Sequence, residues 1–346
     1  MLGTVGLFIA AFVFFNANAL LKATGIVGND ADIATQDYGF EIHYIDVGQA
    51  DSALVICDGE YMLIDGGNVD DSSLIYSYLR SQQVPELDYV VATHPHEDHM
   101  GGLAGALNYT KANAALCPVT DYDSKIFDDF AKALKKHGTK ITVPYEGDGF
   151  MLGSAVVDIL ACNAGEDPNN SSIVLKITYG DTSFLFTGDA EYECEHSLLD
   201  RWFDVECDVL KVAHHGSSTS SSYRFLREAD PQYAVISVGK NNEYGHPHDE
   251  VMSRLSDAEI PIYRTDLCGD IICKSDGENI VFEFPDMDEK RSSESPREMV
   301  LNTNRMRYHE LGCESIETTT DRNKKEFYGT STEVEQMGYS PCGSCH

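Results

Sequence analysis

Positively charged residues are scarce in this chain of 346 residues, where 25 Lys and Arg stand against 57 Asp and Glu. The formal net charge is therefore -32 at pH 7. This imbalance argues against the binding of nucleic acid by a broadly basic surface. A polyanionic substrate would have to be held locally, and bound metal ions are the obvious source of local positive charge.

Long apolar runs are also absent, with one exception at the N-terminus. Residues 1–21 contain no charged side chain, and residues 5–15 are almost wholly apolar. This pattern predicts that residues 1–24 form either a cleaved signal peptide or an uncleaved membrane anchor, with a buried helix as the remaining alternative. The tripeptide at 17–19 fits a cleavage site, but no basic residue precedes the apolar run, since Lys22 is the first cation. We therefore expect an extracellular protein, either secreted or held at the membrane.

The chain contains no internal repeat, and its 42% hydrophobic residues are enough for a substantial core. Its length predicts one large domain and a small one. Residues 286–298 are charged and Ser-rich without apolar periodicity, which is typical of a linker. The linker would separate a body at 38–285 from a compact tail at 299–346.

Apolar periodicity predicts strands and helices in alternation. Residues 40–46 alternate along the chain, and the segments 51–67 and 171–189 each have the pattern of a hairpin. Buried strands are predicted at 87–94, 208–217 and 231–239, and helices at 73–84 and 124–138, the second ending at a Gly stop signal. The predicted fold class is α/β, with two sheets in the core and helices outside them.

The segment "THPHEDHMGG" follows one of these strands and carries three histidines and two acids. On an extended loop His94 and His96 point the same way, so they could bind one metal ion while Asp98 and His99 turn toward a second. A strand end loaded with imidazoles and a carboxylate has little structural use. The segment therefore predicts a two-metal site.

The remaining ligands must come from other strand ends. "FLFTGDAE" offers Asp189, whose two oxygens could bridge the metals. "LKVAHHGSS" offers His214 and His215, and "YGHPHDE" offers His246 and His248.

Together these motifs resemble the metallo-β-lactamase fold. "HPHEDH" fits its H-x-H-x-D-H signature, and the order of "HYIDVGQADS", "LIDGG", "NNSSIVLKI", "TGDAE" and "LKVAHHGSS" is similar to the hydrolase domain of ComEC-type competence proteins. The resemblance covers about residues 40–285. It implies an αββα sandwich with a two-metal site at loops between the sheets, in which Asp189 bridges the metals. It also implies that one histidine of the 214–215 pair completes the second site.

We predict seven metal ligands: His94, His96, Asp98, His99, Asp189, His215 and His246. The assignment of His214 and His215 could be reversed, and His248 could also contribute. Many relatives supply a third histidine to the first metal, whereas only His137 lies in that interval here, so Asn170 or Ser172 could stand near that metal instead. The first site could therefore bind manganese as readily as zinc.

The predicted chemistry follows from the metals. Two such cations lower the pKa of bound water to about 7 and neutralise the charge that develops on the substrate. The predicted catalytic residues are Asp98, His214 and His248, of which either histidine could protonate the leaving group. Asp65 could orient a ligand histidine or could simply be a turn residue.

The cysteines form two groups. Seven are scattered through the body, where Cys194 with Cys207, or Cys268 with Cys273, could form disulfides, although buried thiols are the simpler expectation. In the tail, His309, Cys313, Cys342 and Cys345 match a closed structural zinc site. The tail resembles Ada-type zinc-binding modules, and with few large apolar side chains it is expected to need its metal to fold.

The predicted function is that of an exported dinuclear metal-dependent hydrolase, with DNA or another phosphodiester as the substrate. Two alternatives stay open at this point. One is the hydrolysis of a lactone, thioester or β-lactam on the same fold, and the other is a non-catalytic binding module that metals merely organise.

Overall fold

The computed structural model describes residues 38–162, 167–287 and 294–345. The N-terminal segment predicted to be a signal or an anchor lies outside these residues. No helix within the described ranges has the length and apolar character that a membrane span requires.

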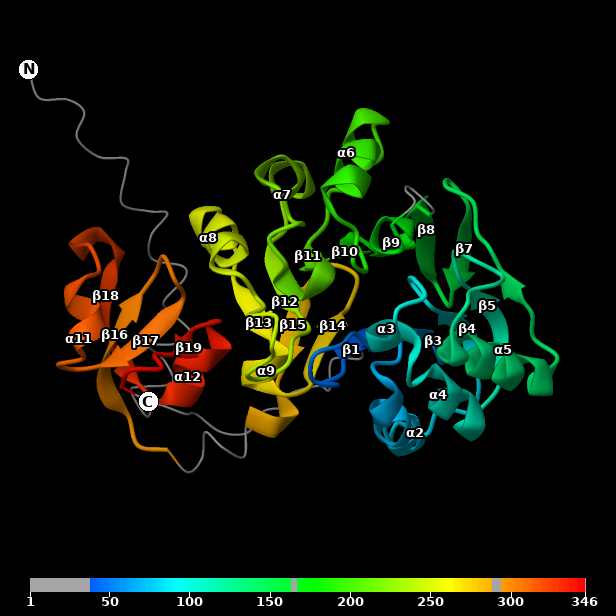
Figure 1. The fold of residues 1–346 in the computed structure, drawn as a ribbon, viewed down its shortest axis with the longest axis horizontal. Helices are drawn as coiled ribbons and strands as arrows, with labels where there is room; N and C mark the ends of the chain where they lie inside the picture. The colour runs from blue at the N-terminus through cyan, green and yellow to red at the C-terminus, as the bar shows by residue number, and fades with distance from the viewer. Residues whose placement is uncertain (1–37, 163–166, 288–293, 346) are drawn as a thin grey trace, which may run out of the picture. The chain divides into compact units, whose positions relative to one another are not determined.

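Two sheets form the centre of the body (Figure 1). The first has eight strands, in the order β15 (Ile280–Glu283), β14 (Ile271–Ser275), β1 (Phe40–Tyr44), β2 (Ala53–Cys57), β3 (Glu60–Ile64), β4 (Leu87–Val91), β5 (Ala112–Leu116) and β6 (Ile141–Thr142). The second has seven strands, in the order β13 (Ile262–Arg264), β12 (Tyr233–Ile236), β11 (Val209–Lys211), β10 (Thr182–Phe186), β9 (Val174–Tyr179), β8 (Ala155–Ala161) and β7 (Gly149–Leu152).

The inner faces of the two sheets pack against each other through apolar side chains. In β1 the alternation places Phe40, Ile42 and Tyr44 on the inner face, as the sequence predicts. The ring of Phe40 stacks on Phe184 of the second sheet with centroids 4.8 Å apart. Fully burying one such side chain contributes roughly 1.5–3 kcal/mol. The interior between the sheets is therefore the main core.

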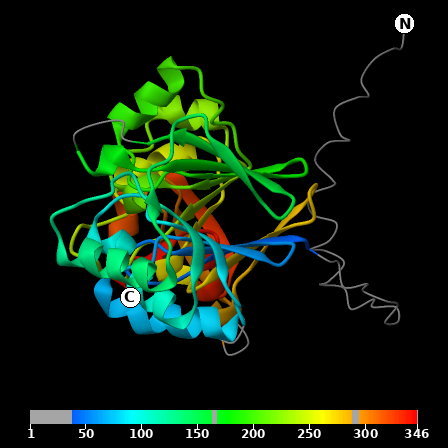
Figure 2. The ribbon, with the colours of Figure 1, turned by 90° about the vertical axis from the view of Figure 1, so that its right-hand side faces the viewer.

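Helices cover the outer face of each sheet (Figure 2). The first sheet is covered by α2 (Ser72–Ser81), α4 (Leu103–Tyr109) and α5 (Lys125–His137), and the second by α6 (Tyr192–Asp200), α7 (Tyr223–Ala229) and α8 (Asp249–Asp257). The short helices are α3 (Glu97–Met100), α9 (Thr265–Cys268), η1 (Val69–Asp71), η2 (Asn169–Ser171) and η3 (Ala213–Gly216). This helix, sheet, sheet, helix order is the predicted αββα sandwich.

Helix α5 illustrates how the sequence fixes a helix and its buried face. The Ser124 hydroxyl accepts a hydrogen bond from the backbone N–H of Phe127 at the start, and Gly138 ends the helix with a left-handed φ of 78°. Between these ends Phe127, Phe130 and Leu134 recur at helical spacing and are buried against the first sheet.

The C-terminal residues form a third, four-stranded sheet. Its order is β18 (Lys324–Gly329), β16 (Arg297–Asn302), β17 (Arg307–Glu310) and β19 (Ser340–Pro341), and it is joined by α11 (Glu314–Glu317), η4 (Asp321–Asn323) and α12 (Ser331–Gln336). Strand β16 begins two residues before the predicted boundary at 299, inside the stretch predicted to be linker. The boundaries of the domains otherwise stay predictions.

This C-terminal module packs on the body rather than standing apart from it. Leu301 and Tyr308 share one apolar cluster with Met252 of α8. The hydroxyl of Ser256 donates to the carbonyl of Thr303 at 2.9 Å. Both kinds of contact hold the module against the end of the body that carries α8.

The cysteines of the two disulfides considered for the body, Cys194 with Cys207 and Cys268 with Cys273, are not bonded to one another, and all four are buried. The two disulfides considered for the body are therefore not formed. Burial raises the pKa of Cys194 and of Cys268 to about 12, so both stay protonated at neutral pH. These side chains behave as small apolar residues of the core.

Candidate metal centre

The predicted ligands meet where strands of both sheets end. The segment from His94 to His99 follows β4, Asp189 follows β10, and His215 follows β11. Close backbone packing fixes the first of these loops, because a side chain at Gly102 would place its Cβ 2.0 Å from the carbonyl oxygen of Gly66. Helix α3 then turns the chain by one helical turn, which separates the directions of the ligand side chains.

One half of the site brings three side chains together with one oxygen of Asp189. His99 Nε2 lies 3.1 Å from Asp189 Oδ1, and His215 Nε2 lies 3.9 Å from the same oxygen. Asp98 Oδ2 closes the group at 3.3 Å from His215 Nε2 and 4.0 Å from His99 Nε2. One ligand atom from each of the four residues lies within 4.8 Å of the others, which is the spacing of a metal site.

The other half of the site faces the second oxygen of Asp189. Oδ2 lies 3.8 Å from His94 Nε2 and 3.7 Å from His214 Nε2. His96 joins this side, since its Nδ1 lies 3.0 Å from His94 Nε2. The two carboxylate oxygens of Asp189 therefore face different sets of histidines, which is the arrangement that a bridging ligand requires.

The structure separates the two adjacent histidines that the sequence could not. His215 is buried beside Asp98 and Asp189 Oδ1, whereas His214 is partly exposed and lies on the side of Oδ2. Both have a left-handed backbone, with φ of 52° and 53°. This unusual conformation of consecutive non-glycine residues directs the two rings to opposite halves of the site.

The residues present fit divalent metal ions. Nε2 of His99 and Oδ1 of Asp189 are buried and make no hydrogen bond with the described residues, although they lie 3.1 Å apart. Such atoms are costly to bury unless something binds them. Imidazole nitrogens and carboxylate oxygens suit zinc and manganese alike. The donor set therefore fits two divalent cations and leaves their identity open.

The electrostatics of the site are those of strongly coupled acids and bases. Burial by itself would lower the pKa of His215, but the nearby carboxylates of Asp189 and Asp51 outweigh it and raise that pKa to about 10. Burial would raise the pKa of Asp98, but His99 and His215 outweigh it and lower that pKa to about 2. In the metal-free protein the site is therefore held together by ion pairs.

Asp65 lies behind His99. Its carboxylate is 2.8 Å from His99 Nδ1 and also accepts hydrogen bonds from the backbone N–H and the hydroxyl of Thr93, both at 2.7 Å. The residue has a left-handed φ of 58°, so it is also a turn residue. Asp65 thus has both roles that the sequence left open: it is a turn residue, and its carboxylate orients the ring of His99, whose Nε2 is the predicted ligand atom.

Asp51 and Lys211 are parts of the site that the sequence reasoning missed. Lys211 is buried on β11, and its Nζ lies 2.8 Å from Asp51 Oδ2, while Asp51 Oδ1 lies 3.3 Å from His215 Nδ1. Burial would raise the pKa of Asp51, but Lys211 and His215 outweigh it and lower that pKa. The sequence did contain a signal for this pair, because Lys211 stands among apolar residues of a predicted buried strand. A lysine buried there is stable only when an acidic side chain pairs with it.

The remaining predicted histidines lie at the rim of the site. His246 is half-buried, with its ring centroid 5.7 Å from that of His214 and 6.3 Å from that of His215. His248 is turned away from Asp189: its Nδ1 accepts a hydrogen bond from Ser218 N–H at 2.9 Å, and its Nε2 lies 3.2 Å from the carbonyl of Tyr244. A catalytic role for His248 stays a prediction, and this geometry gives it no support.

Three further residues were considered for the first metal. Ser172 lies behind two of the predicted ligands, since its hydroxyl is 3.5 Å from His94 Nδ1 and accepts a hydrogen bond from the backbone N–H of Asp189. Asn170 instead accepts hydrogen bonds at the start of α6, and His137 contacts the carbonyl of Leu107. Ser172 is therefore the one that supports the site.

The predicted tail ligands also come together. One ligand atom from each of His309, Cys313, Cys342 and Cys345 lies within 4.8 Å of the others. Burial raises the pKa of Cys342, but hydrogen bonds from Ser315 and the backbone of Ser344 outweigh it and lower that pKa to about 7. Three sulfurs and one imidazole are typical of a structural zinc site, while zinc itself and the resemblance to Ada-type modules stay predictions.

Comparison with known proteins agrees with this arrangement. The family model of the Metallo-beta-lactamase superfamily matches residues 45–240. ComE operon protein 3 of Bacillus subtilis (strain 168) is 31% identical over 252 residues, which are 67% of this chain and 32% of that protein. Competence protein ComA of Neisseria gonorrhoeae is 30% identical over 226 residues, 65% of this chain and 30% of that protein.

A third relative, Recombination protein 2 of Haemophilus influenzae, is 26% identical over 238 residues, 67% of this chain and 28% of that protein. The chain thus spans about a third of the length of the curated relatives it matches. The resemblance to the competence branch, predicted from the motifs, is confirmed.

Proposed function

The chain belongs to the metallo-beta-lactamase superfamily, and from this premise we propose that it is an exported phosphodiesterase that hydrolyses DNA with two divalent cations. The observation that carries the proposal is the position of Asp189, whose two oxygens face two different sets of histidine and carboxylate ligands. When bound, such a pair of cations activates water and offsets the negative charge of a phosphodiester.

The half of the site around Oδ2 has fewer protein ligands than the other half. His94, His96 and Asp189 give this half three protein ligands, and catalytic sites commonly keep such an open position. The other half has four ligands, of which Asp98 has a side chain 33% exposed. Asp98 is thus both a ligand and a group at the solvent-facing edge, where it can accept a proton from attacking water.

His214 is the proposed proton donor to the leaving oxygen. Its side chain is 22% exposed, and its Nδ1 lies 3.2 Å from the carboxylate of Glu191. Glu191 in turn accepts a hydrogen bond from Thr219 at 2.8 Å, which fixes its position. The Glu191 carboxylate accepts the Nδ1–H and orients Nε2 into the site, so that the doubly protonated ring would give its Nε2 proton to the leaving oxygen and keep the one on Nδ1.

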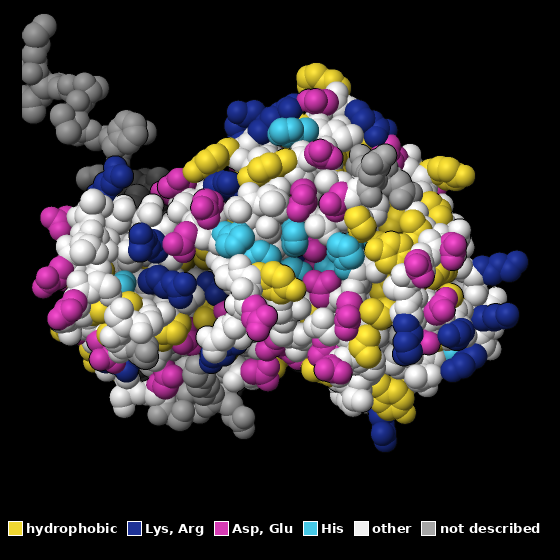
Figure 3. Space-filling model, viewed as in Figure 1, with side chains coloured by type: hydrophobic (Ala, Val, Ile, Leu, Met, Phe, Trp, Pro, Cys, Tyr) yellow, Lys and Arg dark blue, Asp and Glu magenta, His cyan; other side chains and the backbone are white. Residues whose placement is uncertain are grey.

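The choice of DNA rests on the names of relatives and on charge. One of the similar proteins is named as a competence protein and one for recombination, a process that acts on DNA. An acidic protein repels DNA unless positive charge is concentrated where the backbone binds. Two metal ions at the site would supply that charge. Figure 3 shows where they would be held, since histidine side chains gather on one face among acidic side chains.

Export is part of the proposal and rests on the uncharged, apolar stretch at residues 1–21. If that segment is retained, the membrane is a second partner of the chain, and if it is cleaved, the protein is secreted.

The test uses the full-length chain loaded with zinc or manganese. We expect cleavage of DNA and of bis(4-nitrophenyl) phosphate, and no comparable activity on lactones, thioesters or β-lactams. The variant Asp189→Ala should lose activity by about a thousand-fold or more, since it removes several kcal/mol of metal-dependent stabilisation. The matched control Asp158→Ala changes an exposed aspartate of β8 and should keep full activity.

Two outcomes would contradict the proposal. Hydrolysis of a small ester without any hydrolysis of phosphodiesters would replace DNA by an ester, thioester or lactam substrate. Full metal loading with no hydrolysis of any of these would instead favour a binding module that the metals organise.

A further inference from the structure

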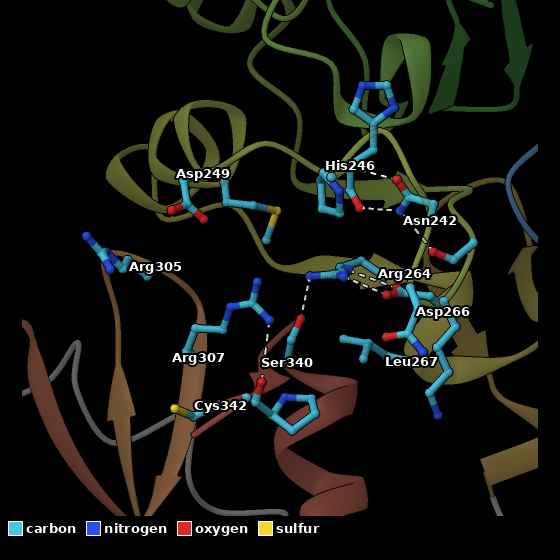
Figure 4. A pocket seen from close by; sticks show the side chains of 18 residues that line it. Asn242, His246, Asp249, Arg264, Asp266, Leu267, Arg305, Arg307, Ser340 and Cys342 are labelled. Atoms are coloured by element: carbon cyan, nitrogen blue, oxygen red, sulfur yellow. Dashed lines mark hydrogen bonds and ion pairs between the residues drawn. The ribbon is translucent and has the colours of Figure 1, made fainter. Parts of the chain in front are cut away.

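A pocket of about 400 Å³ lies between the loop at 239–247 and the C-terminal module (Figure 4). The body contributes His246, Asp249 and Met252 to its lining, and the module contributes Arg305 and Arg307 from the β16–β17 hairpin. This volume is within the range of about 300–1,000 Å³ that small-ligand sites occupy.

His246 lies between the pocket and the metal centre. The residue lines the pocket, while its ring, which Figure 4 shows turned away from the arginines, lies 5.7 Å from the ring of His214, which faces Asp189. Gln49 steadies the ring, since its side-chain nitrogen lies 3.4 Å from His246 Nδ1. A substrate bound at the metals could therefore extend past His246 into the pocket.

The pocket concentrates positive charge in a chain whose net charge is -32. Lys240, Arg305 and Arg307 are exposed, and none forms an ion pair with another described residue. Arg307 donates one hydrogen bond to the carbonyl of Pro341 at 3.4 Å, which leaves its other donors available. The three cations thus face the pocket without carboxylate partners.

The other charges of the lining are mostly balanced. Arg264 is held by Asp266 through two hydrogen bonds, of 2.9 and 2.6 Å, and also donates to Ser340. Asp249 is the one further carboxylate of the lining, so positive charge exceeds negative charge there. Guanidinium groups that are not engaged by carboxylates are well suited to bind phosphate oxygens in pairs.

We propose that this pocket binds the backbone phosphates that flank the scissile bond of a polynucleotide, with Arg305 and Arg307 as the main contacts. The inference rests on the proposed phosphodiesterase function and extends it to the length of the substrate. It gives the C-terminal module a role in substrate binding, because both arginines belong to that module.

The test compares a long and a short substrate in the full-length, metal-loaded protein. The double variant Arg305→Ala/Arg307→Ala should raise KM for a single-stranded oligonucleotide by about tenfold or more, because phosphate contacts are lost. Its kcat, and its hydrolysis of bis(4-nitrophenyl) phosphate, should not change, since the small diester does not reach the pocket. The salt dependence of oligonucleotide binding should also become shallower, by about 0.7 in slope for each lost contact.

Two matched variants distinguish the positive charge of the pocket from positive charge elsewhere in the module. Arg322→Ala/Lys325→Ala removes two exposed cations of the same module that do not line the pocket, and should leave KM unchanged. Arg305→Lys/Arg307→Lys keeps the charge and should restore much of the affinity. Zinc content and circular dichroism equal to those of the unmodified chain would show that each variant is folded.

If Arg305→Ala/Arg307→Ala and Arg322→Ala/Lys325→Ala had the same KM for the oligonucleotide, the inference would be overturned, while the phosphodiesterase function would stand. If the unmodified chain cleaved no phosphodiester at all, the proposed function would fail, and fluorescence anisotropy of a labelled oligonucleotide would then decide about the pocket. Loss of oligonucleotide binding in Arg305→Ala/Arg307→Ala but not in Arg322→Ala/Lys325→Ala would support phosphate binding by the pocket. Absence of oligonucleotide binding to the unmodified chain would overturn it.

Discussion

The two candidate metal centres of this chain differ in almost every physical respect. The centre in the body takes nitrogen and oxygen ligands from loops far apart in sequence, and it keeps Asp98 and His214 partly exposed. The centre in the tail takes three sulfurs and one imidazole from a short stretch, and His309, Cys313 and Cys342 are buried. An open site with nitrogen and oxygen ligands suits chemistry, whereas a closed thiolate site suits structural support.

The two centres also differ in what holds the surrounding chain together. The body has its own core between and outside two sheets, and buried cations such as Lys211 balance the carboxylates of its site. The tail has a four-stranded sheet and joins an apolar cluster of the body through a few side chains. We therefore expect metal to be needed for activity in the body and for folding in the tail.

The largest expected effect concerns the tail. Cys342→Ser should lose the tail zinc completely and unfold the module, because three remaining ligands leave the site open. Limited proteolysis should then cut within residues 297–345, while hydrolysis of bis(4-nitrophenyl) phosphate continues. Ser344→Ala is the control and should keep the zinc, and a Cys342→Ser protein with full tail zinc would exclude Cys342 as a ligand.

The next effect concerns the buried ion pair of the body. Lys211→Met should lower the free energy of unfolding by about 3–5 kcal/mol, because Asp51 would remain buried without its lysine. Lys176→Met is the matched control in the same sheet, since its partner Asp204 is 74% exposed and such a pair contributes about 0–1 kcal/mol. Urea unfolding followed by circular dichroism measures both. Equal losses in the two variants would mean that the Asp51 pair has no special role.

A smaller effect is expected at Asp65, which lies behind the predicted ligand His99. Asp65→Asn keeps the size of the side chain but removes the charge beside His99 Nδ1, so metal affinity in the body should fall by about 10–100-fold. Competition with a coloured chelator measures this affinity, and the tail zinc of the same sample serves as an internal reference. An unchanged affinity would reduce Asp65 to a turn residue.

The smallest effect is the pH dependence of metal loading. Because the pKa of His215 in the metal-free protein is raised to about 10, the ring carries a proton at neutral pH that the metal must displace. Apparent affinity should therefore rise by up to about tenfold per pH unit for each proton released. Calorimetry at pH 6, 7 and 8 in buffers of different protonation heat counts the protons, and a count of zero would contradict the displacement.

The raised pKa of His215 also makes the stability of the metal-free protein depend on pH. A pKa raised above the ordinary value of His contributes stability that is fully present below about pH 6.5 and is lost as the pH rises through about 10. The metal-free body should accordingly lose stability between these two values, whereas the metal-loaded body should not.

The sequence predicted those parts of the fold that local patterns encode. Alternation in β1 and helical spacing in α5 marked which side chains are buried, and the strands before the site were found because they are short apolar runs. Strands β5, β8 and β14 were missed, and so were the edge strands β7 and β15, which have few buried side chains and weak patterns.

For the site, sequence by itself determined the chemistry. Histidines and aspartates that follow apolar strands, with Asp189 among them, indicate a candidate metal centre because few structural needs place such side chains there. Likewise a histidine and three cysteines in the tail indicate a second candidate centre, with thiolate ligands. Both statements depend on residue type and local spacing, which the sequence contains in full.

Only the tertiary structure decided which residues act together. It placed His215 beside Asp98 and His214 beside Glu191, turned His248 toward backbone groups, and brought Lys211 to Asp51 across two sheets. It also placed arginines of the tail in the pocket that His246 lines. Such partnerships join residues distant in sequence, and they follow from how the sheets and the module pack, which no local pattern records.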